Sequence, residues 1–395
     1  MIQKIKRPVL IWVSALLLVG GIVAFQTKND RLFAIAKSID IFAALIRELD
    51  TYYVDQIDPE KLLTVGIQAM LEELDPYTEY IPEEESDDFR MLTTGEYAGV
   101  GALIGNRGEG NIVIMPYTGF PAQNAGMRIG DLLLKVDSIA VLKKTTSEVS
   151  ELLKGPANTG VTVTVKRGED TLQFSLNRKK ISLKNVPFYG KLDEQTGYIK
   201  LSDFTTNASA EVRNALVSLK AQGATQLVLD LRDNPGGLIN EAVEIVNLFV
   251  PKGKEVVKTI GKLQQVNYTY KTNKTPVDTK IGIIVLINDR SASAAEIVAG
   301  ALQDYDRAVL LGQKSFGKGL VQTTLPLSFN AQIKVTTAKY YIPSGRCIQA
   351  IDYAKSREEG SAGTVPDSLR KAFKTTNGRI VLDGAGIEPD EKVTE

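Results

Sequence analysis

The spacing of apolar and polar residues changes along the chain, and each change predicts a different kind of structure. Residues 8–25 form one apolar run without a charge, whereas residues 29–92 carry apolar side chains at the three- and four-residue spacing of helices. Between residues 97 and 181, short alternating runs predict strands. From 188 to 350, strand-like and helix-like runs alternate, which predicts an α/β sheet with functional loops at its strand ends. We therefore expect a multidomain α/β (α+β) chain.

The same changes divide the chain into five segments. No internal repeat and no low-complexity tract interrupts them. The expected segments are a signal peptide or signal anchor at 1–28, a helical region at 29–92, a small β-rich domain at 93–181, an α/β domain at 182–350, and a C-terminal extension packing on that domain at 351–395.

The N-terminus predicts where the protein resides. Three cations in the first seven residues precede 18 uncharged residues from Pro8 to Phe25, roughly 27 Å as a helix at ~1.5 Å per residue. This order is typical of a secretory signal or an uncleaved anchor, and a buried core helix is the alternative. Because Phe25 and Gln26 stand where a cleavage site needs small residues, we expect an inner-membrane anchor. The rest of the chain would then lie in the cell envelope, on the extracytoplasmic (periplasmic) side.

Composition excludes several classes of function. The 47 basic residues balance 47 acidic ones, and no basic block stands outside the N-terminus, so nothing indicates nucleic acid. The single cysteine, Cys347, permits no internal disulfide. The chain contains no histidine, which excludes Ser-His-Asp triads, Cys-His proteases and HExxH zinc enzymes. Any hydrolase here must use a lysine, carboxylates or a carboxylate-bound metal.

The stretch "NDRSASAAEI", residues 288–297, places two serines at a predicted helix start. Ser293 and Glu296 have the spacing of a capping box, so a purely structural N-cap is one interpretation of Ser293. Ser291 lacks such a partner and is interpreted as a loop residue. A serine at a helix N-terminus also lies where free amides stabilise a developing oxyanion, and the N–H of Ala294 would be one donor.

A second oxyanion donor is expected in the loop "DNPGG", which follows a predicted strand. Gly236 and Gly237 leave their amides open to close approach by a substrate carbonyl, as an oxyanion hole requires. The alternative is a β-turn that only starts the next helix.

Lys318, in "GQKSFGKGLVQ", is the candidate general base. Its pKa must fall by about 2 to 3 from its ordinary value near 10.4, and burial between Gly317 and Gly319 would lower it. Gln322 lies on the same face and would hold the amine by a hydrogen bond. A solvated surface lysine is the alternative. The spacing also matches a phosphate-binding loop, but Gly319 replaces the Ser or Thr that binds Mg²⁺, and a strand-like run follows.

The stretch "YAGVGALIG" is the candidate peptide-binding site. Gly99, Val100, Gly101 and Ala102 allow successive amides to point into one pocket, where a peptide's terminal carboxylate would bind; a tight turn without a ligand is the alternative. Together with "GFPAQNAGMRIGDLLLKVDSIAV" and "ELLKGPANTGVTVTVKR", this segment resembles a PDZ domain of bacterial proteases. Asn158 stands where that pattern more often has glycine, a mild change because Asn tolerates positive φ.

Taken as an ordered set, the motifs resemble the C-terminal processing peptidases, or tail-specific proteases. The set is "ELDPYTEYI", "DLRDNPGG", "SASAAEI", "AGALQDYDRA", "FGKGLVQ", "TTAKYYIPSGRCI" and "GAGIEPD", and it covers roughly residues 40–390. The resemblance implies that Ser293, 25 residues before Lys318, is the nucleophile, Lys318 the general base and Gln322 its partner. It also implies Ala294 and a glycine of "NPGG" as oxyanion donors.

The resemblance further implies a PDZ domain ahead of a ClpP/crotonase-like core, and a Ser-Lys serine endopeptidase that cuts proteins at or near apolar C-terminal tails. No metal and no other cofactor is implied. Further candidate partners are an adaptor or lipoprotein that delivers substrates, and a second copy of the chain. The alternative function is a membrane-tethered PDZ binding or scaffold protein with an inactive peptidase-like core.

Overall fold

The structure is a computed structural model that describes residues 7–83, 94–351, 353 and 367–393, with side chains described from residue 30 onward. The chain forms two compact units, Met1–Met70 and Leu71–Glu395, which are treated separately below.

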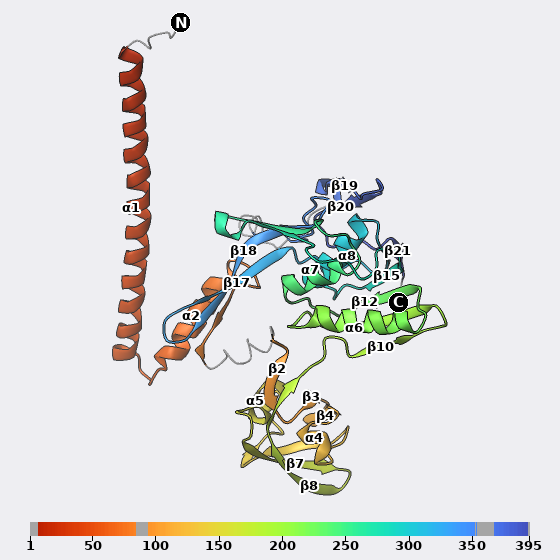
Figure 1. Cartoon of the computed structure of the whole chain (residues 1–395). Helices are drawn as coiled ribbons and strands as arrows, with labels where there is room; N and C mark the ends of the chain where they lie inside the picture. Colours follow the sequence, from red (N-terminus) through yellow and green to blue (C-terminus); the bar gives the residue numbers. More distant parts are fainter. Residues whose placement is uncertain (1–6, 84–93, 352, 354–366, 394–395) are drawn as a thin grey trace. The chain divides into compact units, whose positions relative to one another are not determined.

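Two helices make up the first unit (Figure 1). They are α1 (Arg7–Tyr52) and the greater part of α2 (Pro59–Glu72), and Gly66 of α2 lies beside the ring of Phe42 of α1. Where side chains are described, no helix is both long enough and apolar enough to cross a membrane. The signal or anchor expected at residues 1–28 lies outside those residues.

In the described part of the expected helical region at 29–92, helix α2 ends at Glu72 and a strand follows before the described residues break off at 83. Asp75 starts a turn by accepting the N–H groups of Tyr77 and Thr78 at 2.9 and 3.0 Å, and β1 (Glu79–Ile81) follows it. Strand β1 pairs with a strand of the α/β domain, so the end of this region belongs to the second unit. Residues 84–93 lie outside the described part of the chain.

Residues 94–182 form a small β domain. Its main sheet has the order β3-β4-β5-β7-β8, with β6 beside β5, while β2 and β9 form a separate pair. Helix α5 begins with the predicted capping box between Thr145 and Glu148, and Asn158 adopts a φ of 67°. The elements are β2 (Glu96–Gly99), β3 (Ala102–Asn106), β4 (Asn111–Pro116), α4 (Pro121–Asn124), β5 (Leu132–Val136), β6 (Ile139–Ala140), α5 (Thr146–Leu153), β7 (Gly160–Arg167), β8 (Asp170–Asn177) and β9 (Lys179–Ser182).

The α/β domain is built on a six-stranded sheet of order β10-β11-β12-β15-β16-β21, in which only the β10–β11 pair is antiparallel. Helices α6, α7 and α8 pack against this sheet (Figure 1), and together they bury a continuous apolar core. The elements are β10 (Phe188–Lys191), β11 (Thr196–Lys200), α6 (Ala208–Ala221), β12 (Gln226–Asp230), α7 (Ile239–Asn247), β15 (Gly282–Ile287), α8 (Ala294–Asp304), β16 (Val309–Gly312) and β21 (Glu391–Lys392).

A second sheet of order β1-β18-β13-β14, with β17 paired to β18, lies in the same unit. Its further strands are β13 (Glu255–Gly261), β14 (Tyr268–Lys271), β17 (Leu320–Pro326) and β18 (Gln332–Tyr341). The strand after Lys318 excludes the helix that a phosphate-binding loop requires. The C-terminal residues add a hairpin of β19 (Ala372–Lys374) and β20 (Ile380–Leu382), and β21 pairs with β16.

The sheet topology determines where the candidate residues meet. Strands β12, β15 and β16 are adjacent and parallel, so their carboxyl ends lie at one edge of the sheet. The loop after β12 carries Gly236 and Gly237, the loop after β15 carries Ser293, and the loop after β16 carries Lys318. This edge is where parallel sheets generally place their sites.

Candidate active site

Ser293 stands in a strained turn at the start of α8. Its φ of 56° and ψ of −113° are unusual for a residue with a side chain, and such strain is often found at functional positions. Ser291 is fully buried, and its hydroxyl donates to the Leu231 carbonyl at 2.8 Å and accepts the Asn288 N–H at 3.0 Å. Ser291 therefore fixes the loop, whereas Ser293 is half-buried and forms the predicted capping box with Glu296.

Glu296 joins the loop that carries Ser293 to the loop that carries Lys318. Its carboxylate is fully buried, and the same oxygen, Oε2, accepts the N–H of Ser293 at 2.8 Å and the N–H of Lys318 at 2.9 Å. The other oxygen accepts the hydroxyl of Ser315 at 2.6 Å and the N–H of Gly317 at 2.7 Å. Burial raises the pKa of Glu296 to about 7, and the four donors oppose that rise.

Tyr340 joins the same two loops through their carbonyl groups. Its side chain is 1% exposed, and its hydroxyl lies 2.6 Å from the carbonyl oxygen of Lys318 and 3.1 Å from that of Ser293. The backbone N–H groups of both residues are thus bound by one carboxylate, and their carbonyl groups by one phenol. This arrangement determines the separation of the two loops from both sides.

Lys318 has the environment expected of a base whose pKa is lowered. Its side chain is half-buried; desolvation is the main cause that lowers the pKa of its amine, and the charge of Lys334 adds to it. Glu79, Asp75 and Glu296 act in the opposite direction. Among the described residues, the amine makes no hydrogen bond. Its contact is the face of the Tyr77 ring, with Nζ 4.3 Å from the ring centroid.

Gln322 lies in β17, four residues after Lys318, and its side chain points to another partner. Its amide Nε2 donates to the hydroxyl of Thr336 at 3.2 Å, and that hydroxyl donates to Asp75 Oδ1 at 3.1 Å. Asp75 also accepts the hydroxyl of Thr78 at 3.0 Å. No bond from Gln322 to the amine of Lys318 occurs among the residues that the structure describes, so a supporting role for Gln322 stays a prediction.

The two glycines of the "NPGG" loop differ in what their amides do. Gly236 packs directly on the loop of Ser293, because a Cβ built there would lie 2.8 Å from Ser293 Cβ and 2.8 Å from Ala294 N. Its own N–H, however, donates to Asn234 Oδ1 at 2.8 Å, since that side chain closes the turn. Gly236 therefore offers no free donor in this structure. The amides of Gly237 and Ala294 have no acceptor within the described part of the chain.

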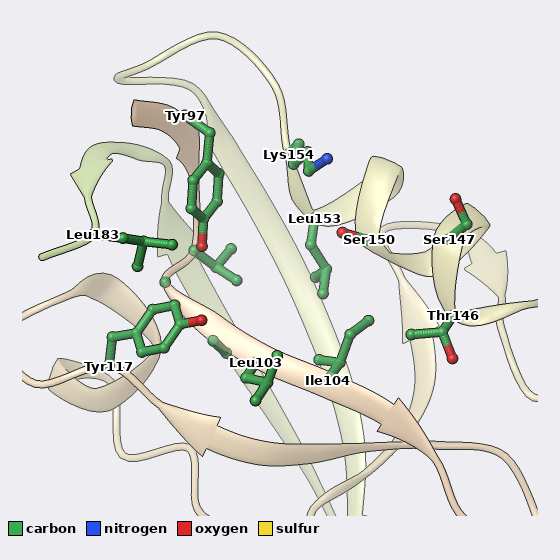
Figure 2. A pocket seen from close by; sticks show the side chains of 13 residues that line it. Tyr97, Leu103, Ile104, Tyr117, Thr146, Ser147, Ser150, Leu153, Lys154 and Leu183 are labelled. Carbon is green, nitrogen blue, oxygen red and sulfur yellow. The ribbon is translucent and has the colours of Figure 1, made fainter. Parts of the chain in front are cut away.

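The predicted carboxylate nest borders a pocket of about 340 Å³ in the small β domain. Figure 2 shows the pocket between strand β3 and helix α5, with Leu103 and Ile104 on one side and Leu153 on the other. The N–H groups of Val100 and Gly101 have no acceptor among the described residues, and Gly101 has a φ of 74°. Gly99 ends β2, and Ala102 begins β3. Strand β3 is the edge of its sheet, so it is open to pairing.

Known proteins resemble this chain along most of its length. The model of peptidase family S41 matches residues 195–358, and a PDZ-domain model matches residues 113–167. A protein described as a CtpA-like serine protease, from Staphylococcus aureus strain N315, is 34% identical, with 98% of this chain and 81% of that protein covered. The chain belongs to peptidase family S41.

One further relative and one solved structure are also similar to this chain. A carboxy-terminal-processing protease of Bartonella bacilliformis is 35% identical, over 87% of this chain and 81% of its own length. Among solved structures, a protein assigned to the S41 proteases of Bacteroides fragilis shares the fold, with a TM-score of 0.50, 16% identity and coverage of 87% and 84% of the two chains. The expected family, its PDZ domain and its serine peptidase activity are thereby confirmed.

Sequence reasoning missed several residues that surround Ser293 and Lys318. Glu296 was interpreted only as a capping residue, although a fully buried carboxylate needs more than one donor. Tyr340 and Thr336 lie in a strand whose pairing partners could not be assigned from the sequence. Tyr77 and Asp75 fall in "ELDPYTEYI", which belongs to the family resemblance but was assigned to the helical region. Within the described residues, no group of three or more potential metal ligands occurs.

Proposed function

We propose that this S41 peptidase hydrolyses peptide bonds through Ser293 and Lys318. The neutral amine of Lys318 takes the proton of Ser293, and Ser293 Oγ attacks the substrate carbonyl carbon. The ammonium then gives that proton to the amine leaving group as the peptide C–N bond breaks. Water then attacks the carbonyl carbon of the resulting ester and loses a proton to Lys318. The ammonium returns that proton to Ser293 Oγ as the ester C–O bond breaks and the acid leaves.

The observation that carries this proposal is the shared carboxylate oxygen. Glu296 Oε2 lies within hydrogen-bond distance of the amides of both Ser293 and Lys318, so the two residues are neighbours although their loops follow different strands. The lowered pKa of Lys318 supports its role as acceptor, because an ordinary lysine would stay protonated at neutral pH. The free amides of Ala294 and Gly237 are our candidates for the oxyanion hole.

We further propose that the PDZ domain binds the C-terminal tail of the substrate. The free amides of Val100 and Gly101 would bind the terminal carboxylate, while the tail adds as a strand beside β3. The apolar side chains of the pocket favour an apolar last residue. Protein substrates with apolar tails are therefore the expected class.

The test compares cleavage of a protein substrate with an apolar tail by the unmodified enzyme and by Ser293→Ala and Lys318→Ala. Each substitution should lower kcat/KM by at least about a thousandfold, because neither partner works without the other. Lys314→Ala, in the same loop but exposed, is the matched control and should retain activity. If the unmodified enzyme cleaves no faster than Ser293→Ala, the protein is a PDZ binding protein with an inactive core.

The same substrate with an amidated C-terminus tests the groove separately. Amidation removes the negative charge that the amides of Val100 and Gly101 would bind, so KM should rise while the dyad stays intact. An unchanged KM would reject carboxylate capture and leave the catalytic proposal standing.

We also propose that residues 1–28 anchor the protein in the inner membrane, with the peptidase on the extracytoplasmic side. The support is the sequence alone: cations followed by an uncharged apolar run. Fractionation of cells, with protease added to intact and lysed spheroplasts, checks both the anchor and its orientation. Release of the chain into the soluble fraction would contradict the anchor. An adaptor or lipoprotein partner and self-association stay predictions.

A further inference from the structure

The base of the proposed dyad rests on an aromatic ring from a distant part of the chain. Lys318 Nζ lies 4.3 Å from the centroid of Tyr77, well inside the ~6 Å over which a cation is attracted to a ring face. Tyr77 precedes β1, whereas Lys318 precedes β17, and both strands pair with β18. The second sheet therefore brings the ring and the amine together.

The position of Tyr77 is fixed by its neighbours rather than by a flexible loop. Asp75, which is 8% exposed, accepts the backbone N–H of Tyr77 at 2.9 Å. The Thr336 hydroxyl on β18 donates to the same carboxylate at 3.1 Å. Directly after this turn, Glu79 pairs with Lys334 in the sheet register, and their side chains form an ion pair at 2.9 Å. These contacts place the ring where the amine of Lys318 meets it.

A half-buried ammonium without a hydrogen-bond acceptor needs another source of stabilisation. Among the described residues, the ring face of Tyr77 is the contact that the amine makes. We propose that Tyr77 is a third catalytic side chain, whose ring face binds the ammonium of Lys318 and holds the positive charge that the base carries between proton transfers. The proposal rests on the proposed role of Lys318 as the base.

The groups around Lys318 change the pKa of its amine in both directions. Burial and Lys334 lower the pKa of Lys318, while Glu79, Asp75 and Glu296 raise it. Burial also raises the pKa of Tyr77 above its ordinary value, so the phenol stays neutral and acts through its ring. Attraction to the ring face favours the charged amine. A ring of the same shape with a less negative face must therefore lower the pKa of Lys318.

The experiment replaces Tyr77 by phenylalanine and then by phenylalanines carrying increasing numbers of ring fluorines. Fluorine withdraws electron density from the ring face and leaves the shape and the burial nearly constant. The pKa of Lys318 is measured in the full chain, in a Ser293→Ala background, from the pH dependence of acetylation of the Lys318 peptide by mass spectrometry. We expect it to fall stepwise by about one pH unit across the series.

Cleavage by enzymes that keep Ser293 provides the second measurement. The acidic limb of the kcat/KM profile should move to lower pH by the same amount as the amine titration. Glu296 also titrates in the site, but the substitutions leave its donors unchanged, so its contribution stays constant across the series. The same fluorinated residues at Phe188, a ring that is 60% exposed, are the matched control and should move neither measurement.

The outcomes separate this proposal from the one on which it rests. An unchanged or raised pKa of Lys318 across the series overturns the role of Tyr77, and so does a loss of activity at every pH without a shift of the limb. If the unmodified enzyme does not exceed Ser293→Ala, the proposed catalysis fails, and the acetylation series still decides whether the ring binds the ammonium.

Discussion

The loops of the proposed dyad and the groove of the PDZ domain use their backbone amides in different ways. In the loops of the dyad, the amides of Ser293, Gly317 and Lys318 all donate to the buried carboxylate of Glu296. In the groove, the amides of Val100 and Gly101 have no acceptor among the residues that the structure describes. Internal partners thus fix the loops of Ser293 and Lys318 before a ligand binds and leave the amides of Ala294 and Gly237 open, whereas the groove is lined by donors that a ligand would satisfy.

This difference indicates how each region is made specific. A site that must hold a strained serine and a lysine with a lowered pKa requires fixed loops, and internal partners provide them before substrate arrives. A groove that accepts many tails needs only open amides and an apolar wall, because the main chain of any peptide presents the same atoms. Substitutions of internal partners should therefore damage the core, and changes of backbone shape should damage the groove.

Among the residues that hold the two loops in place, Glu296→Gln should have the largest effect. The side-chain amide has the shape of the carboxylate, but its NH₂ group faces donors where an oxygen accepted them. We expect kcat/KM to fall at least about a hundredfold, because the loops shift, and the free energy of unfolding to fall by about 2–3 kcal/mol. Kinetics and denaturant titration measure the two losses.

The matched control is Glu244→Gln, in which the altered carboxylate pairs with Lys274 at 2.8 Å on the periphery of α7. It should change the stability by less than about 0.5 kcal/mol and leave kcat/KM unchanged. Wild-type kinetics in Glu296→Gln would show that the carboxylate does not position the dyad.

The groove should respond most strongly to Gly101→Ala. A Cβ at this position would lie 2.4 Å from Phe120 Cβ, and the φ of 74° is unfavourable for alanine. The shifted backbone should weaken binding of a peptide with a free apolar C-terminus at least about tenfold, by fluorescence anisotropy. Cleavage of a short internal peptide that does not reach the groove should stay normal.

Gly168→Ala is the control for backbone strain, because it introduces alanine at a positive φ without the clash expected in Gly101→Ala. Gly168 has a φ of 61° in the same domain, but a Cβ there would meet nothing within 4 Å. Its expected cost is about 1 kcal/mol of domain stability without a change in tail affinity. If Gly101→Ala and Gly168→Ala bind the tail with equal affinity, the amides of Val100 and Gly101 are not part of the binding site.

A smaller effect is expected from Tyr340→Phe, which removes the hydroxyl between the carbonyls of Lys318 and Ser293. The lost bond should cost about 1–2 kcal/mol of stability and lower kcat about fivefold to tenfold, since Glu296 still holds the amides. Tyr341→Phe, at the next position of the same strand, is the control and should leave both quantities unchanged. An equal loss in both variants would make the effect of Tyr340 a general one of the strand.

The sequence predicted the parts of the molecule that local pattern determines. The alternation after residue 188 predicted an α/β sheet, and loops after strands that proved adjacent contain Gly237, Ser293 and Lys318. The capping box at Thr145 also appears in the structure, because its two residues are three apart in the chain and need no distant partner.

The sequence failed where partners are far apart along the chain. The turn at Asp75 joins the sheet that borders the active site through the pairing of β1 with β18 and the bond from Thr336, and no local pattern encodes these contacts. The role of Gln322 beside Lys318 stays a prediction, but the bond from its amide to Thr336 on the neighbouring strand had no signal in the sequence. Spacing along a strand determines the face of a side chain, and the partner depends on the strand beside it.

The smallest effect is expected from Lys318→Met. This substitution in the core should raise the free energy of unfolding, whereas Gly168→Ala, in the PDZ domain, should lower it. Burial lowers the pKa of Lys318 in the folded chain, so between that value and its unfolded value the unfolded chain binds more protons. The buried charge therefore lowers the free energy of unfolding. This loss is complete below the pKa that Lys318 has in the folded chain, and it disappears as the pH rises to the pKa of the unfolded chain. Lys318→Met abolishes this loss of stability together with catalysis.

Thermal unfolding should therefore show Lys318→Met about 1–2 °C more stable than the unmodified enzyme at neutral pH, with the difference vanishing near the ordinary pKa of lysine. Lys314→Met, which alters an exposed lysine of the same loop, should show no such pH-dependent difference. A destabilised Lys318→Met would mean that the ring of Tyr77 and the nearby carboxylates already compensate the buried charge. In that case burial of the Lys318 charge would cost the core no free energy of folding.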